Sequence, residues 1–413
     1  MKLPIDGARL QKEIDELSLI SEQPAPVVTR VLFSEADLRG RDFVKNLFRQ
    51  AGLAVREDAV GNIFARWEGR DKSAPALATG SHIDAIPNAG KYDGVVGVLG
   101  AIEAVRALQK TGFVPQRSIE CIVFTAEEPT RFGLGCLGSR ILAGTLSKDK
   151  IAGLRDRDGH DLEFWRKRAH LPGGDPAAAR LAENTYASFV ELHIEQGPIL
   201  EQRNLAIGIV EKIAAPSSLR LQLTGVGGHA GAVLMPGRRD ALLAGAEIAL
   251  EVEKAALASG SPDTVATTGV FRIEPGAVNS VPCHATLEID LRDTQLASRD
   301  AALKKIEAAA VEICHRRGIG LQLERVNVDA PAICDGALVQ SVSGVCEELG
   351  LSFTKMISRA YHDTLFMARI CPATMIFIPC RGGVSHRPDE YSSPQQIADG
   401  VAVLAGTLRR LVE

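Results

Sequence analysis

The segment between residues 76 and 124 constrains the fold most, because it follows the pattern strand, helix, strand. Residues 76–79 and 118–124 are short, mostly apolar runs, which is typical of strands buried on both faces of a sheet. Between them, apolar residues recur at helical spacing and form one stripe: Val95, Val98, Leu99, Ile102, Val105 and Leu108. Together with a third run at 188–193, the pattern predicts a βαβ unit and an α/β layer.

The segment 213–328 differs from the preceding one, because apolar and charged residues alternate along its predicted strands. Leu287, Ile289 and Leu291 alternate with charged residues, as in a strand that is buried on one face only. Further strands are expected at 218–224, 264–273 and 320–326, and helices at 238–257 and 299–317. This predicts an antiparallel sheet with helices on one side.

The last stretch again shows the pattern of apolar strands and amphipathic helices seen in the first segment. It predicts a helix at 336–349, an apolar strand at 374–378 and a helix at 394–411. We therefore expect one α/β domain built from residues 1–212 and 329–413, interrupted by an inserted α+β domain at 213–328.

The composition excludes several classes of protein. The formal net charge is −4, with 46% hydrophobic and 24% charged residues, so neither a nucleic-acid groove nor a basic membrane-binding face is expected. No apolar run approaches the roughly 18 residues that a spanning helix needs, and no secretion signal is visible. The eight cysteines include no Cys-x-x-Cys pair, so we expect reduced thiols in a cytoplasmic protein, with a disulfide as the alternative.

Histidines and carboxylates stand where the predicted strands end. In an open α/β sheet, ligands bind outside the carboxyl ends of the strands, so these side chains should converge. Imidazole and carboxylate groups bind Zn or Mn, and five of them are too many for one tetrahedral site. They suit two metals that share a carboxylate. The predicted ligands are His82, Asp93, Glu128, His193 and His386.

Two neighbouring carboxylates, Glu127 and Glu128, follow the second strand. They are costly there unless a positive charge is nearby, although a solvated acidic pair is the alternative. Because successive side chains of an extended chain point to different sides, one can bind metal while the other holds a water molecule. Asp84 follows His82 at i+2, and we expect its carboxylate to fix the tautomer of that ring.

One motif indicates a different class of function. Gly133, Gly135 and Gly138 match the spacing of a dinucleotide-binding fingerprint. However, residues 125–132 separate them from the strand, and no acidic partner ends a second strand about 20 residues on. An NAD-linked oxidoreductase and a metal-free binding protein are therefore kept only as alternatives.

Several motifs together resemble the di-metal amidohydrolases of the aminoacylase/carboxypeptidase type. Within them, the chain is similar to the ureide branch, which contains allantoate, N-carbamoyl-L-amino acid and ureidoglycolate amidohydrolases. The motifs that carry the resemblance span nearly the whole chain, at 80–84, 92–94, 127–128, 131–133, 191–198, 227–231, 279–282 and 385–386.

The resemblance implies a di-metal exopeptidase-like catalytic domain with an inserted dimerisation (lid) domain, working as a homodimer. Two divalent metal ions are implied for each subunit, with Mn expected and Zn, Ni or Co as alternatives. Asp93 would bridge them, His82 and His193 would bind from either side, and Glu128 and His386 would complete the shells. Glu127 would be the general base.

The resemblance also implies the residues that contact the substrate. His229 would stabilise the oxyanion in the partner subunit's site, whereas Gln196, Asn279 and Arg292 would hold the carboxylate and ureido group. A guanidinium fork fits a carboxylate, although a solvent-facing strand arginine is the ordinary alternative for Arg292.

Pro129 and the stretch 358–363, which contains Tyr361 and His362, depart from the allantoate and carbamoyl-amino-acid patterns. They predict that Tyr361 and His362 line the substrate pocket; the alternative for Tyr361 is a packed aromatic residue. The expected reaction is hydrolysis of the ureido C–N bond of (S)-ureidoglycolate to glyoxylate, ammonia and carbon dioxide. Hydrolysis of allantoate or an N-carbamoyl-L-amino acid by the same machinery is the alternative.

Overall fold

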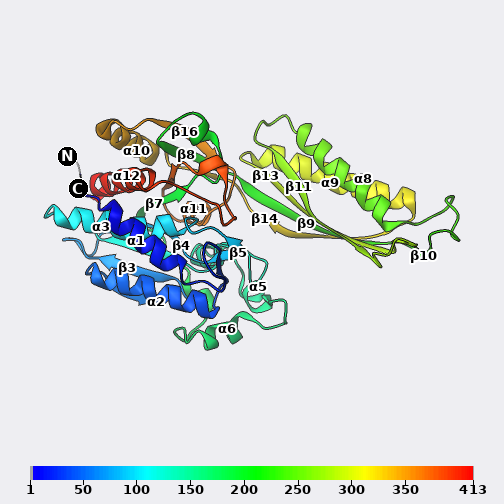
Figure 1. Cartoon of the computed structure of the whole chain (residues 1–413), viewed down its shortest axis with the longest axis horizontal. Helices are drawn as coiled ribbons and strands as arrows, with labels where there is room; N and C mark the ends of the chain where they lie inside the picture. The colour runs from blue at the N-terminus through cyan, green and yellow to red at the C-terminus, as the bar shows by residue number, and fades with distance from the viewer. Residues whose placement is uncertain (1–2, 413) are drawn as a thin grey trace. The chain divides into compact units, whose positions relative to one another are not determined.

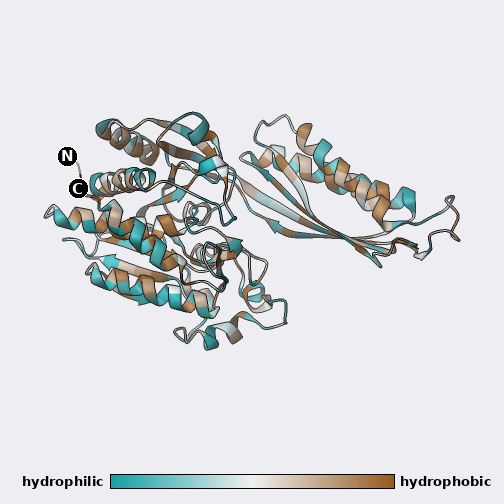
Figure 2. Cartoon of the chain, in the orientation of Figure 1, coloured by the Kyte–Doolittle hydropathy of each residue, from teal (hydrophilic) through white to brown (hydrophobic). Residues whose placement is uncertain are grey.

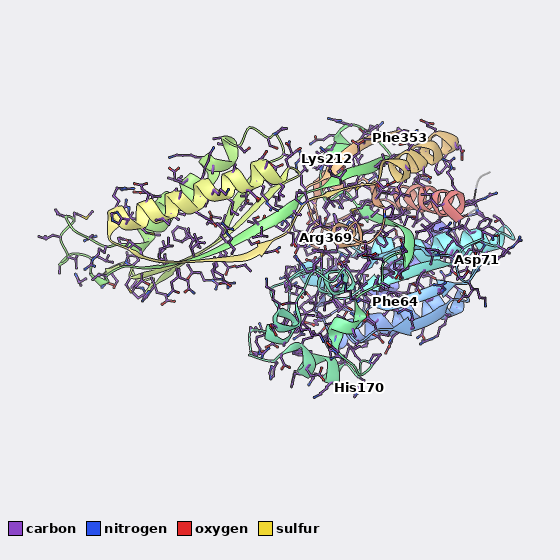
Figure 3. All side chains as sticks on the ribbon, turned by 180° about the vertical axis from the view of Figure 1, so that it is seen from behind. Phe64, Asp71, His170, Lys212, Phe353 and Arg369 are labelled. Carbon is purple, nitrogen blue, oxygen red and sulfur yellow. The ribbon has the colours of Figure 1, made fainter. Side chains whose placement is uncertain are left out.

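The computed structural model describes residues 3–412, which form two compact units. Unit 1 contains the described residues up to Glu211, together with Ile333–Ser358 and the described residues from His362 onward. Unit 2 contains Lys212–Ala332 and Arg359–Tyr361. Lys212, the first residue of unit 2, is labelled in Figure 3. Unit 2 therefore interrupts unit 1 in the sequence.

Unit 1 is built on a nine-stranded mixed sheet. Its centre consists of four parallel, almost entirely buried strands in the order β17 (Ala373–Ile378), β7 (Tyr186–Ile194), β4 (Ala76–His82) and β6 (Ile119–Phe124). Antiparallel strands β3 (Ile63–Trp67) and β2 (Ala54–Glu57) extend the sheet beyond β6. Strands β8 (Ile207–Ile213), β15 (Ala332–Ile333) and β16 (Phe353–Ser358) lie at the opposite edge.

Helices cover both faces of this sheet. Helix α3 (Val95–Lys110) and helix α12 (Pro394–Val412) pack together on one face, with α1 (Gly7–Ser18) and α10 (Gly336–Leu349) beside them (Figure 1). The other face carries α4 (Leu137–Leu142) and α11 (Thr364–Met367), where Phe64, labelled in Figure 3, joins a buried cluster with Phe189 and Met367. A Cβ on Gly97 of α3 would lie 2.4 Å from the Leu192 carbonyl oxygen, so this glycine permits the close packing of helix on sheet.

The remaining elements of unit 1 lie in the connections. Strands β1 (Val28–Arg30) and β5 (Ala85–Ala89) form an antiparallel pair, and Ser34 caps helix α2 (Glu35–Gln50). The short helices are α5 (Lys148–Gly153), α6 (Leu162–Arg168), η1 (Pro176–Ala179), α7 (Ile199–Gln202) and η2 (Arg381–Gly383).

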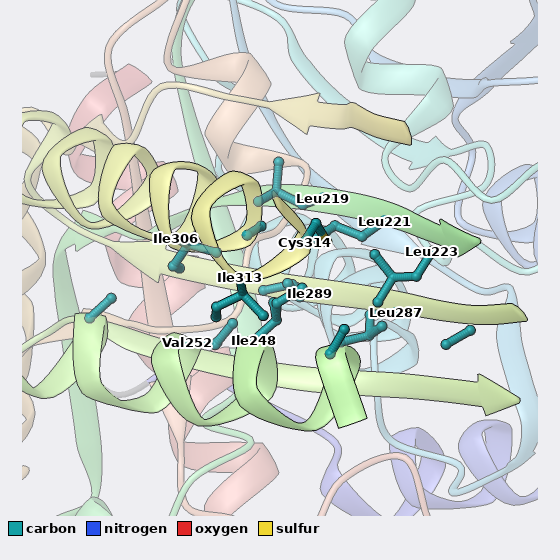
Figure 4. Close-up of a cluster of buried hydrophobic side chains, with 14 of the residues drawn as sticks. Leu219, Leu221, Leu223, Ile248, Val252, Leu287, Ile289, Ile306, Ile313 and Cys314 are labelled. Atoms are coloured by element: carbon teal, nitrogen blue, oxygen red, sulfur yellow. The ribbon is translucent and has the colours of Figure 1, made fainter. Parts of the chain in front are cut away.

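Unit 2 is a four-stranded antiparallel sheet with two helices on one face. The strand order is β11 (Val265–Glu274), β13 (His284–Asp293), β9 (Ala215–Thr224) and β14 (Gly320–Val328). Helices α8 (Ala241–Leu257) and α9 (Leu296–Arg317) cover the face that carries Leu221, Leu287 and Ile289 (Figure 4). Figure 2 shows hydrophobic and hydrophilic residues alternating along both helices. A separate two-stranded pair joins β10 (Gly228–His229) to β12 (Ser280–Val281).

The predicted fold class, an α/β layer with an inserted α+β segment, is confirmed. Helix α8 begins three residues later than expected, because the Asp240 side chain accepts the N–H groups of Leu242 and Leu243 and caps the helix there. The pattern does not predict the shorter strands β1, β5, β10, β12 and β15, nor β2, β3, β8 and β16. Within residues 3–412, no helix is both long and apolar enough to cross a membrane.

Candidate functional site

His82 ends strand β4 and is almost fully buried, at 1% exposure. Its Nδ1 lies 3.0 Å from the backbone carbonyl oxygen of Asp84, which can only accept a hydrogen bond, so Nδ1 carries the proton and Nε2 remains available. Nε2 faces Gly94, which has φ = 65°, and a Cβ there would lie 2.5 Å from Nε2. Glycine at position 94 thus leaves room for the ring and supplies the left-handed backbone.

Asp93 stands between two groups of candidate ligands. Its Oδ1 lies 3.1 Å from Nε2 of His193 and 3.7 Å from Nε2 of His82. Its Oδ2 lies 3.1 Å from Nε2 of His386, which in turn is 3.2 Å from Oε1 of Glu128. Among the groups of possible metal ligands within the described residues, one contains His82, Asp93 and His193, and another contains Asp93, Glu128 and His386.

The structure brings all five predicted ligands together but changes their pairing. His82 and His193 were expected on either side of Asp93, whereas both face Oδ1, and His386 and Glu128 share the Oδ2 side. The reason is topological: β4 and β7 are adjacent parallel strands, so their ends deliver the two histidines to the same place.

The charges of the cluster explain why it is suited to cations. Burial by itself would raise the pKa of Asp93, but hydrogen bonds from His193 and His386 outweigh burial and hold that pKa well below its ordinary range. Burial raises the pKa of Glu127 well above its ordinary range, despite the opposing charge of His82, and also raises the pKa of Glu128. Imidazoles and carboxylates gathered around one shared carboxylate are the donor set that divalent transition metals bind, and all of them except His386 are buried here.

Glu127 lies beside the first group, with Oε2 3.9 Å from Nε2 of His82. Its Oε1 is 3.7 Å from the thiol of Cys136, which can donate to it. The backbone is fixed as well, because the Glu127 carbonyl accepts the Cys136 N–H at 2.7 Å and the Glu127 N–H donates to Asp84 Oδ1 at 3.3 Å. Glu127 is therefore held beside the first ligand group, with Oε2 directed toward His82.

The role expected for the Asp84 carboxylate requires correction. The backbone carbonyl of Asp84, and not its side chain, pairs with Nδ1 of His82, whereas the nearest carboxylate oxygen is 3.6 Å away. The carboxylate instead accepts the backbone N–H groups of Glu127 and Glu128.

The glycine motif at 133–138 has a structural explanation. The N–H of Gly138 donates to the Thr125 carbonyl at 2.7 Å, so the loop folds back along the end of β6. A Cβ on Gly138 would lie 2.1 Å from Oδ1 of Asn62, which accounts for a glycine at this position.

Two predicted substrate-binding residues lie next to the ligand groups in unit 1. Gln196 donates from Nε2 to Asp93 Oδ2 at 2.8 Å and to Ser385 Oγ at 3.2 Å. The buried ring of His362 lies 4.4 Å from the ring of His193, centroid to centroid. Their contact with substrate stays a prediction.

The other four predicted substrate-binding residues belong to unit 2. His229 is exposed and pairs with Ser280, and the neighbouring Asn279 carbonyl accepts the Ala230 N–H, so His229 and Asn279 share one corner.

Arg292 lies 5.6 Å from the ring of Tyr361, which supports a pairing of these two residues. The Nε and Nη2 groups of Arg292 donate to Asp290, an interaction not anticipated from the sequence.

Three buried carboxylates near the site were not predicted. Glu390 accepts the backbone N–H groups of Tyr92 and Asp93, and burial followed by the charge of Asp93 raises the pKa of Glu390 to about 7. Glu191 accepts from Ser81 at 2.7 Å. Burial and the charge of Glu191 raise the pKa of Asp363 to about 8, and Ser139 donates to Asp363 at 2.5 Å. Asp363 lies in the stretch 358–363 that the sequence singled out, whereas Glu390 carries no local signal.

Comparison with known proteins agrees with this geometry. Residues 78–410 match Peptidase family M20/M25/M40. The chain is 53% identical to a ureidoglycolate hydrolase of Arabidopsis thaliana, over 99% of this chain and 87% of that protein. It is 38% identical to an N-carbamoyl-L-amino acid amidohydrolase of Geobacillus stearothermophilus, over 99% of both.

Solved structures agree at the level of the fold. Crystal structures of AtUAH in complex with glyoxylate and with (S)-hydroxyglycine each match with a TM-score of 0.93 and 52% identity, over 100% of this chain and 99% of theirs. The family resemblance predicted from the motifs is thereby confirmed: the chain belongs to Peptidase family M20/M25/M40.

Proposed function

We propose that this chain is an amidohydrolase that converts (S)-ureidoglycolate to glyoxylate, ammonia and carbon dioxide. The observation that carries the proposal is the 53% identity to a ureidoglycolate hydrolase over nearly the full chain, combined with a 0.93 TM-score to AtUAH bound to glyoxylate. A substrate of this kind offers a ureido carbonyl for attack and a carboxylate for recognition.

Two divalent metal ions for each subunit are part of the proposal, with Mn expected. His82 and His193 would hold one ion and Glu128 and His386 the other, with Asp93 shared between them. When bound, such ions lower the pKa of water and polarise the carbonyl under attack. Two observations support the proposal that these residues bind two metal ions. The side chains are of the kinds that bind such ions, and within each of the two groups the candidate ligand atoms lie within 4.8 Å of one another.

Glu127 is the proposed general base. It takes a proton from the attacking water and returns it to the departing ammonia. Attack on the ureido carbon leaves a carbamate, which loses carbon dioxide to give hydroxyglycine, and hydroxyglycine loses a second ammonia to give glyoxylate. Burial raises the pKa of Glu127 in the metal-free protein. Cations at the neighbouring ligand groups would favour the carboxylate form of Glu127, which is the form that accepts a proton.

The family resemblance implies substrate-binding residues in each of the two units, considered separately. The guanidinium group of Arg292 would have to exchange part of its contact with Asp290 for the substrate carboxylate, and Tyr361 beside it would contact the hydroxylated carbon. Gln196, His362 and Asn279 would contact the ureido group. The imidazole of His229 would stabilise the oxyanion, which is the role that the family resemblance implies for it.

A homodimer through unit 2 is also proposed. Helix α8 exposes Leu243, Leu250 and Leu257, which are seven residues apart and therefore lie on one stripe. Leu257 is 83% exposed, which is unfavourable unless another surface covers it. Leu250→Glu should convert the dimer to a monomer in sedimentation velocity, whereas the same substitution at the isolated exposed Leu19 should not.

The cysteines support a reducing compartment, and we propose a cytoplasmic enzyme. All eight cysteines are free, and all except Cys283 are buried.

A substrate panel tests the function. The Mn-loaded protein is assayed for ammonia release from (S)-ureidoglycolate, (R)-ureidoglycolate, allantoate and N-carbamoyl-L-amino acids. We expect the highest kcat/KM with (S)-ureidoglycolate. Faster turnover of allantoate or of a carbamoyl amino acid would favour the alternative that the 38% identical relative represents. Bound nucleotide without metal in the purified protein would contradict both.

A further inference from the structure

We infer that Glu390 is a positioning residue for Asp93, the carboxylate shared by the two ligand groups, and that it holds Asp93 in place by accepting hydrogen bonds. This inference rests on the proposed function, because it assigns Asp93 to metal. Glu390 is 4% exposed and lies four residues beyond His386, so one side chain connects two distant segments of the site.

The first contact is with the backbone that presents Asp93. Oε1 of Glu390 accepts the Tyr92 N–H at 2.8 Å and the Asp93 N–H at 3.1 Å. Both N–H groups precede helix α3 and have no helical partner, so they would be buried without a bond if Glu390 were absent. Glu390 thus fixes the direction in which the Asp93 side chain leaves the backbone.

The second contact is with the hydroxyl group of Ser385. Ser385 Oγ lies 2.9 Å from Oε2 of Glu390 and 3.1 Å from Oδ2 of Asp93. A hydroxyl group has one proton, so it serves one carboxylate at a time, and Glu390 is the nearer acceptor. With this proton directed to Glu390, Oδ2 of Asp93 has one hydrogen-bond donor fewer to compete with a metal ion, and Gln196 remains as a donor to it.

Packing around Glu390 leaves its side chain little conformational freedom. A Cβ on Gly90 would lie 2.4 Å from Cβ of Glu390 and 2.6 Å from its Oε1, so the carboxylate lies directly against the bare backbone at this position. Glu390 is therefore fixed by steric contact on one side and by hydrogen bonds on the other. Loss of its acceptors should loosen Asp93 relative to His386 before it affects His82 and His193.

The test compares two substitutions that fill the same space. Glu390→Gln keeps an acceptor for the two N–H groups, whereas Glu390→Met has none. Mn binding is measured by isothermal titration and by metal content after dialysis. We expect wild type to bind about two ions and Glu390→Met to bind one of them about 10–100-fold more weakly. Glu390→Gln should lose much less affinity.

Glu103→Met is the matched control, because Glu103 is equally buried in unit 1 and accepts the Asp6 N–H. It should lower stability but keep both Mn affinities. The inference would be overturned if Glu390→Met lost no more Mn affinity than Glu103→Met or than Glu390→Gln. It would also be overturned if Glu390→Met bound two Mn ions with wild-type affinity. If Glu390→Met is unfolded by circular dichroism, Glu390→Asp, which is one methylene group too short to reach the same N–H groups, is measured instead, and unchanged Mn affinity would count against the inference. A wild-type protein that binds no Mn would instead refute the proposed cofactor.

Discussion

Asp84 accepts the backbone N–H of Glu128 through Oδ2 at 3.1 Å. Its other oxygen accepts the Glu127 N–H at 3.3 Å, and its own backbone carbonyl pairs with His82. One residue thus fixes a candidate ligand on β4 and the two carboxylates that follow β6. The proposed chemistry depends on this link, because it sets where the proposed base, Glu127, lies relative to the candidate ligands.

Asp84→Asn should therefore weaken both metal retention and turnover. The amide keeps one acceptor oxygen but presents an NH₂ group to one of the two N–H groups, so the loop must shift. We expect about a 10–100-fold loss in kcat, accompanied by weaker Mn binding. Asp71→Asn is the control, because Asp71 accepts N–H groups in an exposed loop. Wild-type kcat in Asp84→Asn would contradict this role.

Glu127→Gln should separate chemistry from metal binding. Loss of the base should lower kcat by roughly 10²–10⁴-fold, while two Mn ions are retained. Glu128→Gln, at the next position in the chain, should show the opposite result, with loss of bound Mn as the primary effect. Steady-state kinetics and elemental analysis of both variants provide the check. Near-normal turnover in Glu127→Gln would remove Glu127 from the mechanism.

Metal binding should strengthen as pH rises. In the metal-free protein, hydrogen bonds with Asp93 and Glu128 raise the pKa of His386 from 6.5 to about 11, although burial opposes this. Protonated His386 therefore stabilises the metal-free fold fully below about pH 6.5, and this contribution is lost as pH rises toward about 11.

Because Mn must displace that proton, its apparent affinity should rise by about tenfold per pH unit within this window. Titration calorimetry in buffers of different ionisation enthalpy would detect the released protons. A pH-independent affinity with no proton release would contradict the assignment of His386 as a ligand.

Arg292→Lys should raise KM more than it lowers kcat. The lysine keeps the charge but loses the planar fork, so roughly 10–100-fold weaker binding of a carboxylate is expected. Arg220→Lys is the matched control, since Arg220 lies on the same sheet and pairs with Glu288 and Glu324. Similar KM changes in both variants would show that Arg292 acts through the sheet and not through the substrate.

The thiol of Cys136 should be inert in the folded protein. Burial, followed by the charge of Glu127, raises its pKa well above the ordinary value, so little thiolate forms. With a thiol-reactive disulfide reagent, Cys283 should react first, as the cysteine of this chain that is not buried. Rapid labelling of Cys136 before Cys283, detected by peptide mass spectrometry, would contradict this packing.

The local sequence pattern was sufficient to predict the helices and strands that are buried along their whole length. The helical stripe from Val95 to Leu108 became α3, and the apolar runs became β4, β6, β7 and β17, because their periodicity reflects burial within a single element. Strand β2 was missed because its four residues, Ala54–Glu57, have no buried side chain that would mark them.

For the candidate site, the sequence by itself determined which kinds of donor are available and that they follow strand ends, since both depend on short-range order. Only the tertiary structure decided that His82 and His193 share one oxygen of Asp93 and that His386 and Glu128 share the other. It also brought Glu390 to the backbone of Asp93 across 297 residues. Such partners are chosen by strand order and loop packing, which no local pattern encodes.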